Sequence, residues 1–152
     1  MDIRFAEKTI IVTGAAHGFG RQIALRFAEL GGAVWACDVL EKELEETRRL
    51  CTGMDGSCDV RLADVTDRDS VFGLVEEASS GFGRVDVLVN NAGGVLGQTG
   101  KPLEDVTPEE WQGLFDVNVT GALTYSQAVA PDMKAAGGGR IINISSGAGL
   151  GV

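Results

Sequence analysis

Short runs of apolar residues alternate along the chain with longer segments in which apolar residues recur every three or four positions. The runs at 10–12, 33–36 and 87–89 are apolar at every position, and a further run occupies most of 140–145. Strands that are apolar without alternation are typical of a parallel sheet whose two faces are covered by helices. With one more strand expected at 57–63, the pattern predicts an α/β fold. This fold is a doubly wound, Rossmann-like parallel sheet of five strands with flanking helices.

Helical periodicity predicts the helices between these strands and the face that each one buries. Asp67 is a suitable N-cap for the third helix, and Thr107 followed by Pro108 is a strong start for the fourth. The acidic residues of the second helix are interpreted as a solvated surface. The residues expected on buried faces are Phe19, Ile23, Ala24, Phe27 and Leu30 in the first helix, Leu40, Leu44, Thr47 and Cys51 in the second, and Val71, Leu74, Val75, Ala78 and Phe82 in the third.

The fourth helix, towards Met133, carries two apolar stripes on faces that are rotated by roughly 120°. We expect one stripe to cover the sheet and the other to remain exposed unless a second helix packs on it. A homo-oligomer, dimer or tetramer, that pairs through the second stripe is therefore predicted, although another part of the same chain could cover that face. The first stripe contains Trp111, Phe115, Ala122, Val129 and Met133, with Asn118 among them, and the second contains Leu114, Val117, Gly121, Thr124 and Ala128.

The first strand passes into the first helix through a glycine-rich turn at 13–20. The N–H groups at a helix start have no partner within the helix, and with the positive end of the helix dipole they attract phosphate. Glycine lets the chain turn sharply and lets a pyrophosphate approach the backbone. A tight strand–helix connection without a ligand could use the same glycines. The residues that we expect to contact the dinucleotide in this turn are Gly14, His17, Gly18, Phe19 and Gly20.

Acidic residues end the second and third strands. Asp38 can accept hydrogen bonds from the adenosine ribose diol, and its charge would repel the 2′-phosphate of NADP, so NAD is the expected cofactor. The alternative is a helix-capping or loop aspartate. Asp64 and Val65 follow the third strand, where the carboxylate could accept a hydrogen bond from the adenine amine while the valine packs on the ring. A strand-end cap is nearly as good an interpretation of Asp64.

The fourth strand ends in the sequence Asn-Asn-Ala-Gly at 90–93. Amide side chains such as that of Asn91 can brace neighbouring strand ends. The small residues Ala92 and Gly93 would let the backbone approach a ribose. The alternative is a plain turn.

Composition and charge narrow the classes of partner. The 152 residues carry a formal net charge of −9, and the 13 Lys and Arg residues form no run, which argues against nucleic acid or an anionic membrane as a partner. The three cysteines include no C-x-x-C pair, so neither a disulfide framework nor a metal site is indicated. We find no signal-peptide pattern and no apolar segment of about 20 residues. A cytoplasmic protein with a small-molecule substrate is expected.

Together these segments resemble the short-chain dehydrogenase/reductase family from Lys8 onward. The resemblance implies hydride transfer between a nicotinamide and an alcohol or ketone carbon. It further implies that a tyrosine is the acid/base and that a lysine lowers the pKa of this tyrosine. By the same resemblance, Ser146 would orient the substrate carbonyl and Asn118 would brace a water molecule. The matching motifs are the TGxxxGxG turn at 13–20, the adenine-binding pair Asp64 and Val65, the NNAG motif at 90–93, the helix asparagine Asn118, and the strand 141–146 that ends in the catalytic serine, Ser146.

The sequence departs from the family pattern after Ser146. The tyrosine and lysine should follow as Y-x-x-x-K, but the chain stops at Val152, and the single tyrosine, Tyr125, has Val129 four residues on. We therefore interpret residues 1–152 as one dinucleotide-binding domain, incomplete on its C-terminal side and inactive alone. The parent is expected to be an NAD-dependent enzyme that interconverts a secondary alcohol and a ketone. A non-catalytic nucleotide-binding or interaction module is the alternative, and the substrate stays open.

Overall fold

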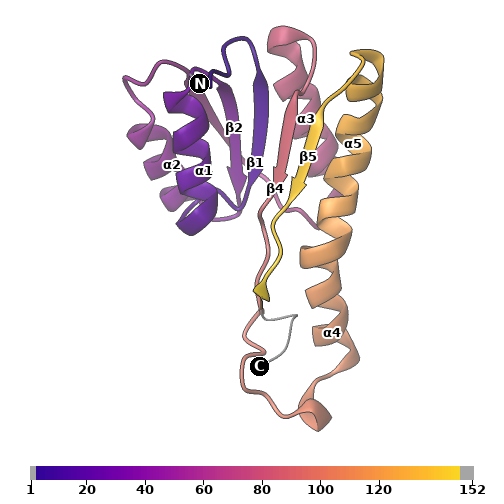
Figure 1. The fold of residues 1–152 in the computed structure, drawn as a ribbon. Helices are drawn as coiled ribbons and strands as arrows, with labels where there is room; N and C mark the ends of the chain where they lie inside the picture. The colour runs from indigo at the N-terminus through magenta and orange to yellow at the C-terminus, as the bar shows by residue number, and fades with distance from the viewer. Residues whose placement is uncertain (1–2, 148–152) are drawn as a thin grey trace.

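The computed structural model describes residues 3–147, which form one parallel sheet in the strand order β3-β2-β1-β4-β5 (Figure 1). This confirms the predicted α/β class and the five parallel strands. Because β1 lies between β2 and β4, the connections diverge from the carboxyl ends of β1 and β4, where ligands bind in doubly wound sheets. The strands are β1 (Thr9–Thr13), β2 (Ala33–Asp38), β3 (Ser57–Leu62), β4 (Val87–Asn90) and β5 (Arg140–Asn143).

Helices cover both faces of the sheet. Successive strand residues point to opposite faces. Ile10 and Val12 are therefore buried in the core beneath the first pair of helices, and Ile11 in the core beneath the second pair. The first pair is α1 (Gly18–Glu29) and α2 (Glu41–Leu50), and the second is α3 (Arg68–Phe82) and α5 (Gly121–Ala135).

Two predicted helix starts are confirmed. One carboxylate oxygen of Asp67 accepts hydrogen bonds from the backbone N–H groups two and three residues later, at 3.0 and 3.3 Å. At the start of α4 (Pro108–Phe115), Thr107 Oγ1 accepts from the Glu110 N–H at 3.3 Å, and the Glu110 carboxylate accepts from the Thr107 N–H at 2.8 Å. These caps satisfy N–H groups that would otherwise lack partners at the helix ends.

The buried face predicted for α1 is partly wrong. Phe19 is 80% exposed, because the helix packs on the sheet through a row of small residues, one position away from the row that contains Phe19. Small side chains let the helix approach the sheet closely, and they are Gly20, Ala24 and Ala28. Leu40 and Phe82 are also exposed, contrary to prediction, because they lie at the ends of α2 and α3.

The fourth predicted helix is not regular throughout. After a 3₁₀ turn at Leu103–Asp105, it consists of α4, a π-helical segment at Asp116–Thr120, and α5. A π-helical turn holds more residues than an α-helical one. It therefore rotates α5 relative to α4, and a constant period of 3.6 assigns the wrong faces.

The predicted oligomer stripe is consequently wrong for α5. Gly121 is buried, and a Cβ added there would lie 2.8 Å from Val65 Cγ2, so another part of the same chain covers this position. Thr124 and Ala128 are buried as well. The apolar residues that this helical region leaves exposed are instead Trp111, Phe115, Val119 and Leu123.

Strand β5 lies at the edge of the sheet and is exposed along its length. Ile141, Ile142 and Ile144 are each 40–44% exposed. Within residues 3–147, β5 pairs with β4 and with no strand on its other side. The apolar residues of this edge are therefore left uncovered by the described part of the chain.

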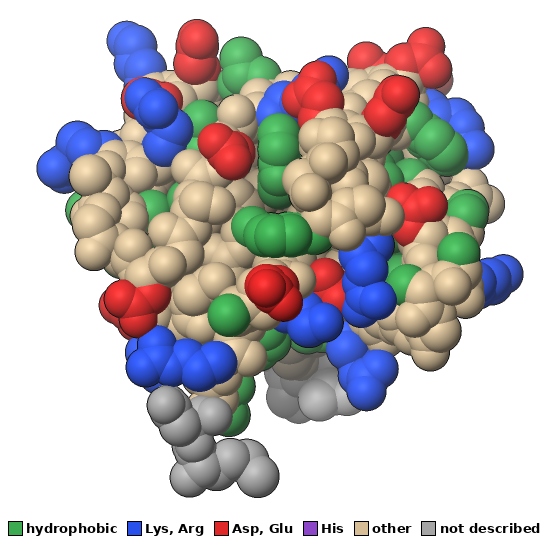
Figure 2. Space-filling model, turned by 90° about the horizontal axis from the view of Figure 1, so that it is seen from above, with side chains coloured by type: hydrophobic (Ala, Val, Ile, Leu, Met, Phe, Trp, Pro, Cys, Tyr) green, Lys and Arg blue, Asp and Glu red, His purple; other side chains and the backbone are tan. Residues whose placement is uncertain are grey.

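Charged side chains of both signs are mixed over the face at the amino-terminal edge of the strands (Figure 2). Among the described residues, no helix is both long and apolar enough to cross a membrane.

Candidate nucleotide-binding site

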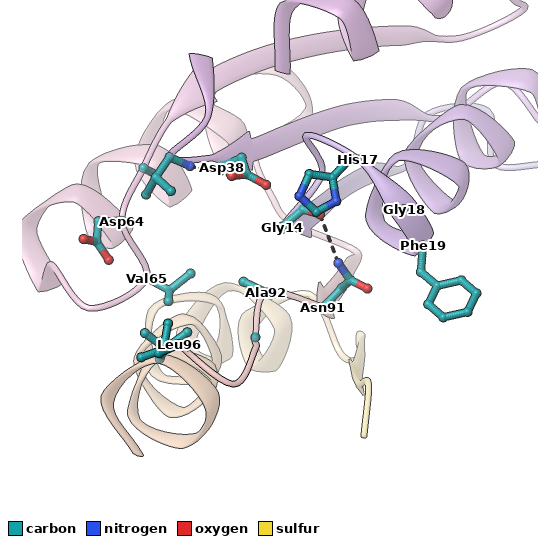
Figure 3. Close-up of a pocket in the computed structure, with 14 residues that line it drawn as sticks. Gly14, His17, Gly18, Phe19, Asp38, Asp64, Val65, Asn91, Ala92 and Leu96 are labelled. Atoms are coloured by element: carbon teal, nitrogen blue, oxygen red, sulfur yellow. Dashed lines mark hydrogen bonds between the residues drawn. The ribbon is translucent and has the colours of Figure 1, made fainter. Parts of the chain in front are cut away.

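A cavity of about 450 Å³ opens at the carboxyl-terminal edge of the sheet (Figure 3). Ten of its lining residues are among those predicted: Gly14, His17, Gly18, Phe19, Asp38, Asp64, Val65, Asn91, Ala92 and Gly93. The remaining lining residues were missed: Val39, Ala63, Leu96 and Val117. Three predicted site residues, Gly20, Asn118 and Ser146, do not line the cavity formed by residues 3–147.

The glycines of the turn have different roles. Gly14 and Gly18 have φ of +66° and +56°, the left-handed region that glycine adopts at no steric cost. A Cβ at Gly14 would lie 2.8 Å from Ala92 Cα, and a Cβ at Gly20 would lie 2.0 Å from Gly14 O. Gly14 and Gly20 therefore allow close packing. At Gly18, by contrast, no atom of the described chain lies within 4 Å of an added Cβ, so there is open space beside its backbone.

The start of α1 presents backbone donors. His17 is the N-cap, and its exposed side chain makes no capping hydrogen bond within the described chain. The Arg21 N–H donates to His17 O at 3.2 Å and is the first donor within the helix, so the N–H groups of 18–20 have no acceptor in the helix. With the positive end of the helix dipole, they form a site that favours an anion.

The carbonyl groups of the turn are held by α1 and α2, a contribution that the sequence analysis missed. Thr47 Oγ1 donates to Ala15 O at 2.8 Å, and the Arg21 guanidinium donates to Ala16 O. The Nε–H of Arg21 also donates to Thr47 Oγ1 at 3.0 Å. Both residues were placed on predicted helices, but which carbonyls they reach depends on how α1 and α2 pack. The turn is thus held in one conformation before any ligand binds.

Asp38 forms the loop cap that was considered as its alternative role, and its side chain also lies at the cavity. Its Oδ2 accepts from the Ala16 N–H at 3.0 Å, and its Oδ1 accepts from the N–H groups of Val39 and Leu40 at 2.8 and 3.1 Å. It therefore caps the loop after β2 and also lines the cavity (Figure 3). A carboxylate offers about four acceptor positions, so capacity remains for a hydroxyl group of a ligand.

Asp64 is partly engaged as a cap as well. Its Oδ1 accepts from the Thr66 N–H at 2.8 Å and from Thr66 Oγ1–H at 2.7 Å. Asp64 and Val65 both line the cavity, on the side opposite Gly18 and Phe19 (Figure 3). The capping interpretation is therefore correct for Oδ1 of Asp64. The position of Asp64 and Val65 at the cavity fits contact with a planar ring.

Asn91 braces the ends of β1 and β4, as predicted. Its Nδ2 donates to Thr13 O at 3.0 Å and to Gly14 O at 3.1 Å, the second bond being drawn in Figure 3. In return, Thr13 Oγ1 accepts from the N–H groups of Asn91 and Ala92 at 3.0 and 2.9 Å. These bonds position the glycine turn against the small residues after β4.

Asn118 holds the loop that follows the NNAG segment. Its Oδ1 accepts from the Gly94 N–H at 2.9 Å, and its Nδ2 donates to Gly94 O at 2.9 Å and to Leu114 O at 2.8 Å. Both ends of the Asn118 amide are therefore engaged with backbone groups. Asn118 lies in the π-helical segment, an irregularity that is frequent at functional sites.

Ser146 and Tyr125 lie in contrasting environments. Ser146 is exposed, and the Ile144 N–H donates to Asn90 O at 2.9 Å, which ties its segment to the end of β4. Tyr125 is fully buried, with its hydroxyl 3.2 Å from Cys37 Sγ. Burial, with Cys37 nearby, raises the pKa of Tyr125 far above its usual range. Tyr125 therefore does not supply an acid/base to the cavity, as predicted.

The family model for short chain dehydrogenases matches residues 8–151. The chain is 35% identical over 148 residues to the 3-oxoacyl-[acyl-carrier-protein] reductase FabG of Thermotoga maritima, covering 97% of this chain and 59% of that protein. A 7α-hydroxysteroid dehydrogenase solved with NADH and 7-oxo glycochenodeoxycholic acid superposes with a TM-score of 0.90 at 32% identity. That match covers 99% of this chain and 58% of the other. A metagenomic short-chain oxidoreductase in complex with NADP gives a TM-score of 0.87 at 34% identity, covering 93% and 63%. The chain thus spans little more than half the length of these relatives.

Proposed function

Because the chain belongs to the short-chain dehydrogenase family, we propose that the protein is an oxidoreductase that interconverts a secondary alcohol and a ketone with NAD. Residues 1–152 would form its dinucleotide-binding domain. The observation that carries the proposal is the convergence of the glycine turn, Asp38 and the NNAG segment on one cavity. Relatives named as dehydrogenases and reductases support the reaction class.

The cavity suits a nicotinamide dinucleotide. The open space beside Gly18 and the donors at the start of α1 would hold the pyrophosphate. Asp38 would bind the adenosine ribose, and Asp64 with Val65 would contact the adenine. Ala92 and Gly93, which have little side-chain bulk, would let the backbone approach the second ribose. When bound, the nicotinamide ring supplies or accepts a hydride.

The preference for NAD rests on charge. The Asp38 carboxylate is held at the cavity by three backbone N–H groups, so it cannot easily turn away from a 2′-phosphate. Val39, its neighbour in the lining, offers no positive charge. Placing two negative charges together out of water costs several kcal/mol. One solved relative carries NADH and another NADP, so the family alone does not decide this preference.

For the chemical step we assign two residues of this chain. The hydroxyl of Ser146 would donate a hydrogen bond to the substrate oxygen, which stabilises the charge that develops on it. Asn118 would act as a positioning residue, because its amide already holds the loop beside Gly93. The proton would be exchanged by the tyrosine of a Y-x-x-x-K motif, which residues 1–152 do not contain.

We further propose a cytoplasmic homo-oligomer. The row of Trp111, Phe115, Val119 and Leu123 is exposed over the helical region 108–135 and would be covered by a second copy. This row replaces the stripe around Gly121, which the chain itself covers. The mass of the natural protein in solution at micromolar concentration tests this, and a monomer would contradict it.

The experiment that tests the reaction is a panel of secondary alcohols incubated with NAD⁺ and the natural protein, with NADH formation as the readout. Ser146→Ala should lower kcat by roughly 10²–10³-fold, because a donor to the reacting oxygen is lost. Ser145→Ala is the matched control and should retain activity. Equal activity in both variants would contradict the assignment of Ser146.

The alternative is a nucleotide-binding module without chemistry. Calorimetric titration with NAD⁺ separates the two possibilities. If the natural protein also lacks the Y-x-x-x-K motif and binds NAD⁺ without turning over a substrate, the module is favoured.

A further inference from the structure

A second, smaller cavity of about 240 Å³ lies where α2 ends and β3 begins, and two cysteines line it. Cys51 is the C-cap residue of α2, and Cys58 is the second residue of β3. The turn between them is fixed at both ends. The Met54 N–H donates to Cys51 O at 3.2 Å, and the Gly56 N–H donates to Ala28 O at 2.9 Å. The packing of α2 on the sheet therefore brings the two thiols to one place.

The thiols interact directly. The two side chains are close enough for one thiol to hydrogen-bond to the other, and both pack on the same apolar core. The third cysteine differs, because Cys37 Sγ lies 3.2 Å from Tyr125 Oη and 3.7 Å from Val12 O in the interior. Among the described residues, Cys51 and Cys58 are thus the pair of thiols in contact, and both are free.

We propose that Cys51 and Cys58 form a redox-active two-thiol site that closes to an intrachain disulfide when a peroxide or a small-molecule disulfide reaches the cavity. The pattern of cysteines along the sequence did not indicate such a pair, because the residues are not arranged as C-x-x-C. The cavity shares no residue with the nucleotide site.

The two sulfurs have different roles in the reaction. Burial raises the pKa of both thiols. We assign the first step to the Cys51 thiolate. It attacks one peroxide oxygen, the O–O bond breaks, and Cys51 becomes a sulfenic acid while the peroxide is reduced. The Cys58 sulfur then attacks the Cys51 sulfur, so that an S–S bond forms and the S–O bond breaks. Two thiols and one hydrogen peroxide yield one disulfide and two waters.

Arg48 lines the same cavity, and its guanidinium is paired with the Glu45 carboxylate. Its positive charge lowers the pKa of Cys58, although burial has the larger effect and keeps the pKa raised. This charge favours the thiolate of Cys58 as it attacks the sulfenic acid. Because both thiols remain mostly protonated near neutral pH, the reaction should be slow and should require an excess of oxidant.

The test treats the natural protein with hydrogen peroxide and maps its peptides without reduction. We expect a link between the peptides of Cys51 and Cys58 with the loss of two hydrogen atoms, reversed by dithiothreitol. Cys51→Ser and Cys58→Ser should each abolish the link, and Cys37→Ala should retain it. An intermolecular link, a link that involves Cys37, or irreversible oxidation of single cysteines would overturn the proposal.

Two measurements on the unsubstituted protein test the proposal without depending on whether a variant folds. Phenylarsine oxide requires two adjacent thiols, so one equivalent should block alkylation of Cys51 and Cys58 together while Cys37 stays unmodified. Independent alkylation of the two cysteines would overturn the proposal. Closing the short loop 51–58 should also lower the unfolding equilibrium constant by roughly 10- to 100-fold. An oxidised form less stable than the reduced one would show that the link forms only after unfolding, which contradicts the site described here.

Discussion

The glycine turn and the segment after β5 lie at the same edge of the sheet, yet the chain holds them very differently. In the turn, the carbonyls of Ala15 and Ala16 accept hydrogen bonds from Thr47 and Arg21. The N–H groups of the same two residues donate to a β2 carbonyl and to Asp38. The β5 segment is exposed on both faces, and the described residues show one strand beside it. We call these regions the turn side (residues 9–65) and the β5 side (residues 108–147).

This difference separates the residues proposed to bind the cofactor from the residues proposed for the chemical step. On the turn side, Gly14, Asp38 and Asp64 are held by bonds among residues of that side or from Asn91. On the β5 side, Ser146 is exposed and Asn118 is bonded to the backbone, and neither lines the cavity that residues 3–147 form. Affinity for the cofactor should therefore be largely a property of these 152 residues, and catalysis should require groups that they do not include.

The largest expected effect is on turnover. A polypeptide of residues 1–152 should be at least 10²–10⁴-fold less active in alcohol oxidation than a natural protein that contains Y-x-x-x-K. The reason is that the polypeptide lacks a positioned acid/base group. It should nevertheless bind NAD⁺. NADH formation measured side by side checks the first statement, and calorimetry checks the second. Comparable turnover would mean that the catalytic groups are assigned wrongly. The activity of Tyr125→Phe would then show whether the buried tyrosine is the acid/base.

The next effect concerns packing on the turn side. Gly20→Ala should cost about 1–3 kcal/mol of unfolding free energy, because its Cβ would lie 2.0 Å from Gly14 O and the turn would have to move. NAD⁺ affinity should fall with it. Gly94→Ala is the control, since no described atom lies within 4 Å of its added Cβ. Urea denaturation of both variants gives the measurement, and equal stability would contradict the close packing of the turn.

A matched pair across β4 and β5 measures how much the β5 side is covered. Val89 is 2% exposed, and its register partner Ile142 is 42% exposed. Val89→Ala should destabilise the chain by about 2 kcal/mol, and Ile142→Ala by less than about 1 kcal/mol. Repeating both in the natural protein sharpens the comparison. If Ile142→Ala is as costly there, other residues cover β5, and an unchanged difference would mean that they do not.

Cofactor choice should respond to Asp38. Asp38→Ala should narrow the preference for NAD over NADP by roughly tenfold, because a like-charge contact with the 2′-phosphate is removed. The ratio of the two dissociation constants is the readout, since it cancels any general loss of stability from the lost backbone bonds. Tighter binding of NADP by the unsubstituted protein would contradict the assignment of NAD.

The smallest expected effect is a pH dependence of the unfolding free energy, which arises from the carboxylate of Asp86 between the two sides. Burial alone would raise its pKa, but hydrogen bonds from Arg84, the Thr9 N–H and Lys8 outweigh burial and hold the pKa below its usual range. A depressed pKa in the folded state means that this stability is present above the ordinary aspartate pKa and is lost as pH falls through the folded value.

Asp86→Asn should therefore flatten the acid limb of the stability curve below about pH 4. Unfolding midpoints at a series of acidic pH values check this. An unchanged acid limb would assign the sensitivity to other carboxylates.

Much of the fold and of the cavity could be predicted from local chemistry. Continuously apolar runs indicated a covered parallel sheet, and the capping residues Asp67 and Thr107 marked helix starts that the structure confirms. The cavity positions were also accessible, because the carboxyl ends of parallel strands meet at one edge. Whether these residues bind a cofactor stays a prediction.

The sequence by itself determined the order of strands and helices, the turn that needs glycine, and the polar residues that end the strands, because these follow from spacing and backbone sterics along the chain. Tertiary structure alone decided what depends on the relative placement of distant segments. The π-helical segment rotated Gly121 into contact with Val65, and the close approach of α1 to the sheet left Phe19 exposed. The packing of α2 on β3 brought Cys51 to Cys58, and the packing of α2 beside the turn brought Thr47 to the Ala15 carbonyl. A constant period or a sequence distance carries no information about such contacts, because they form only when separate elements pack together.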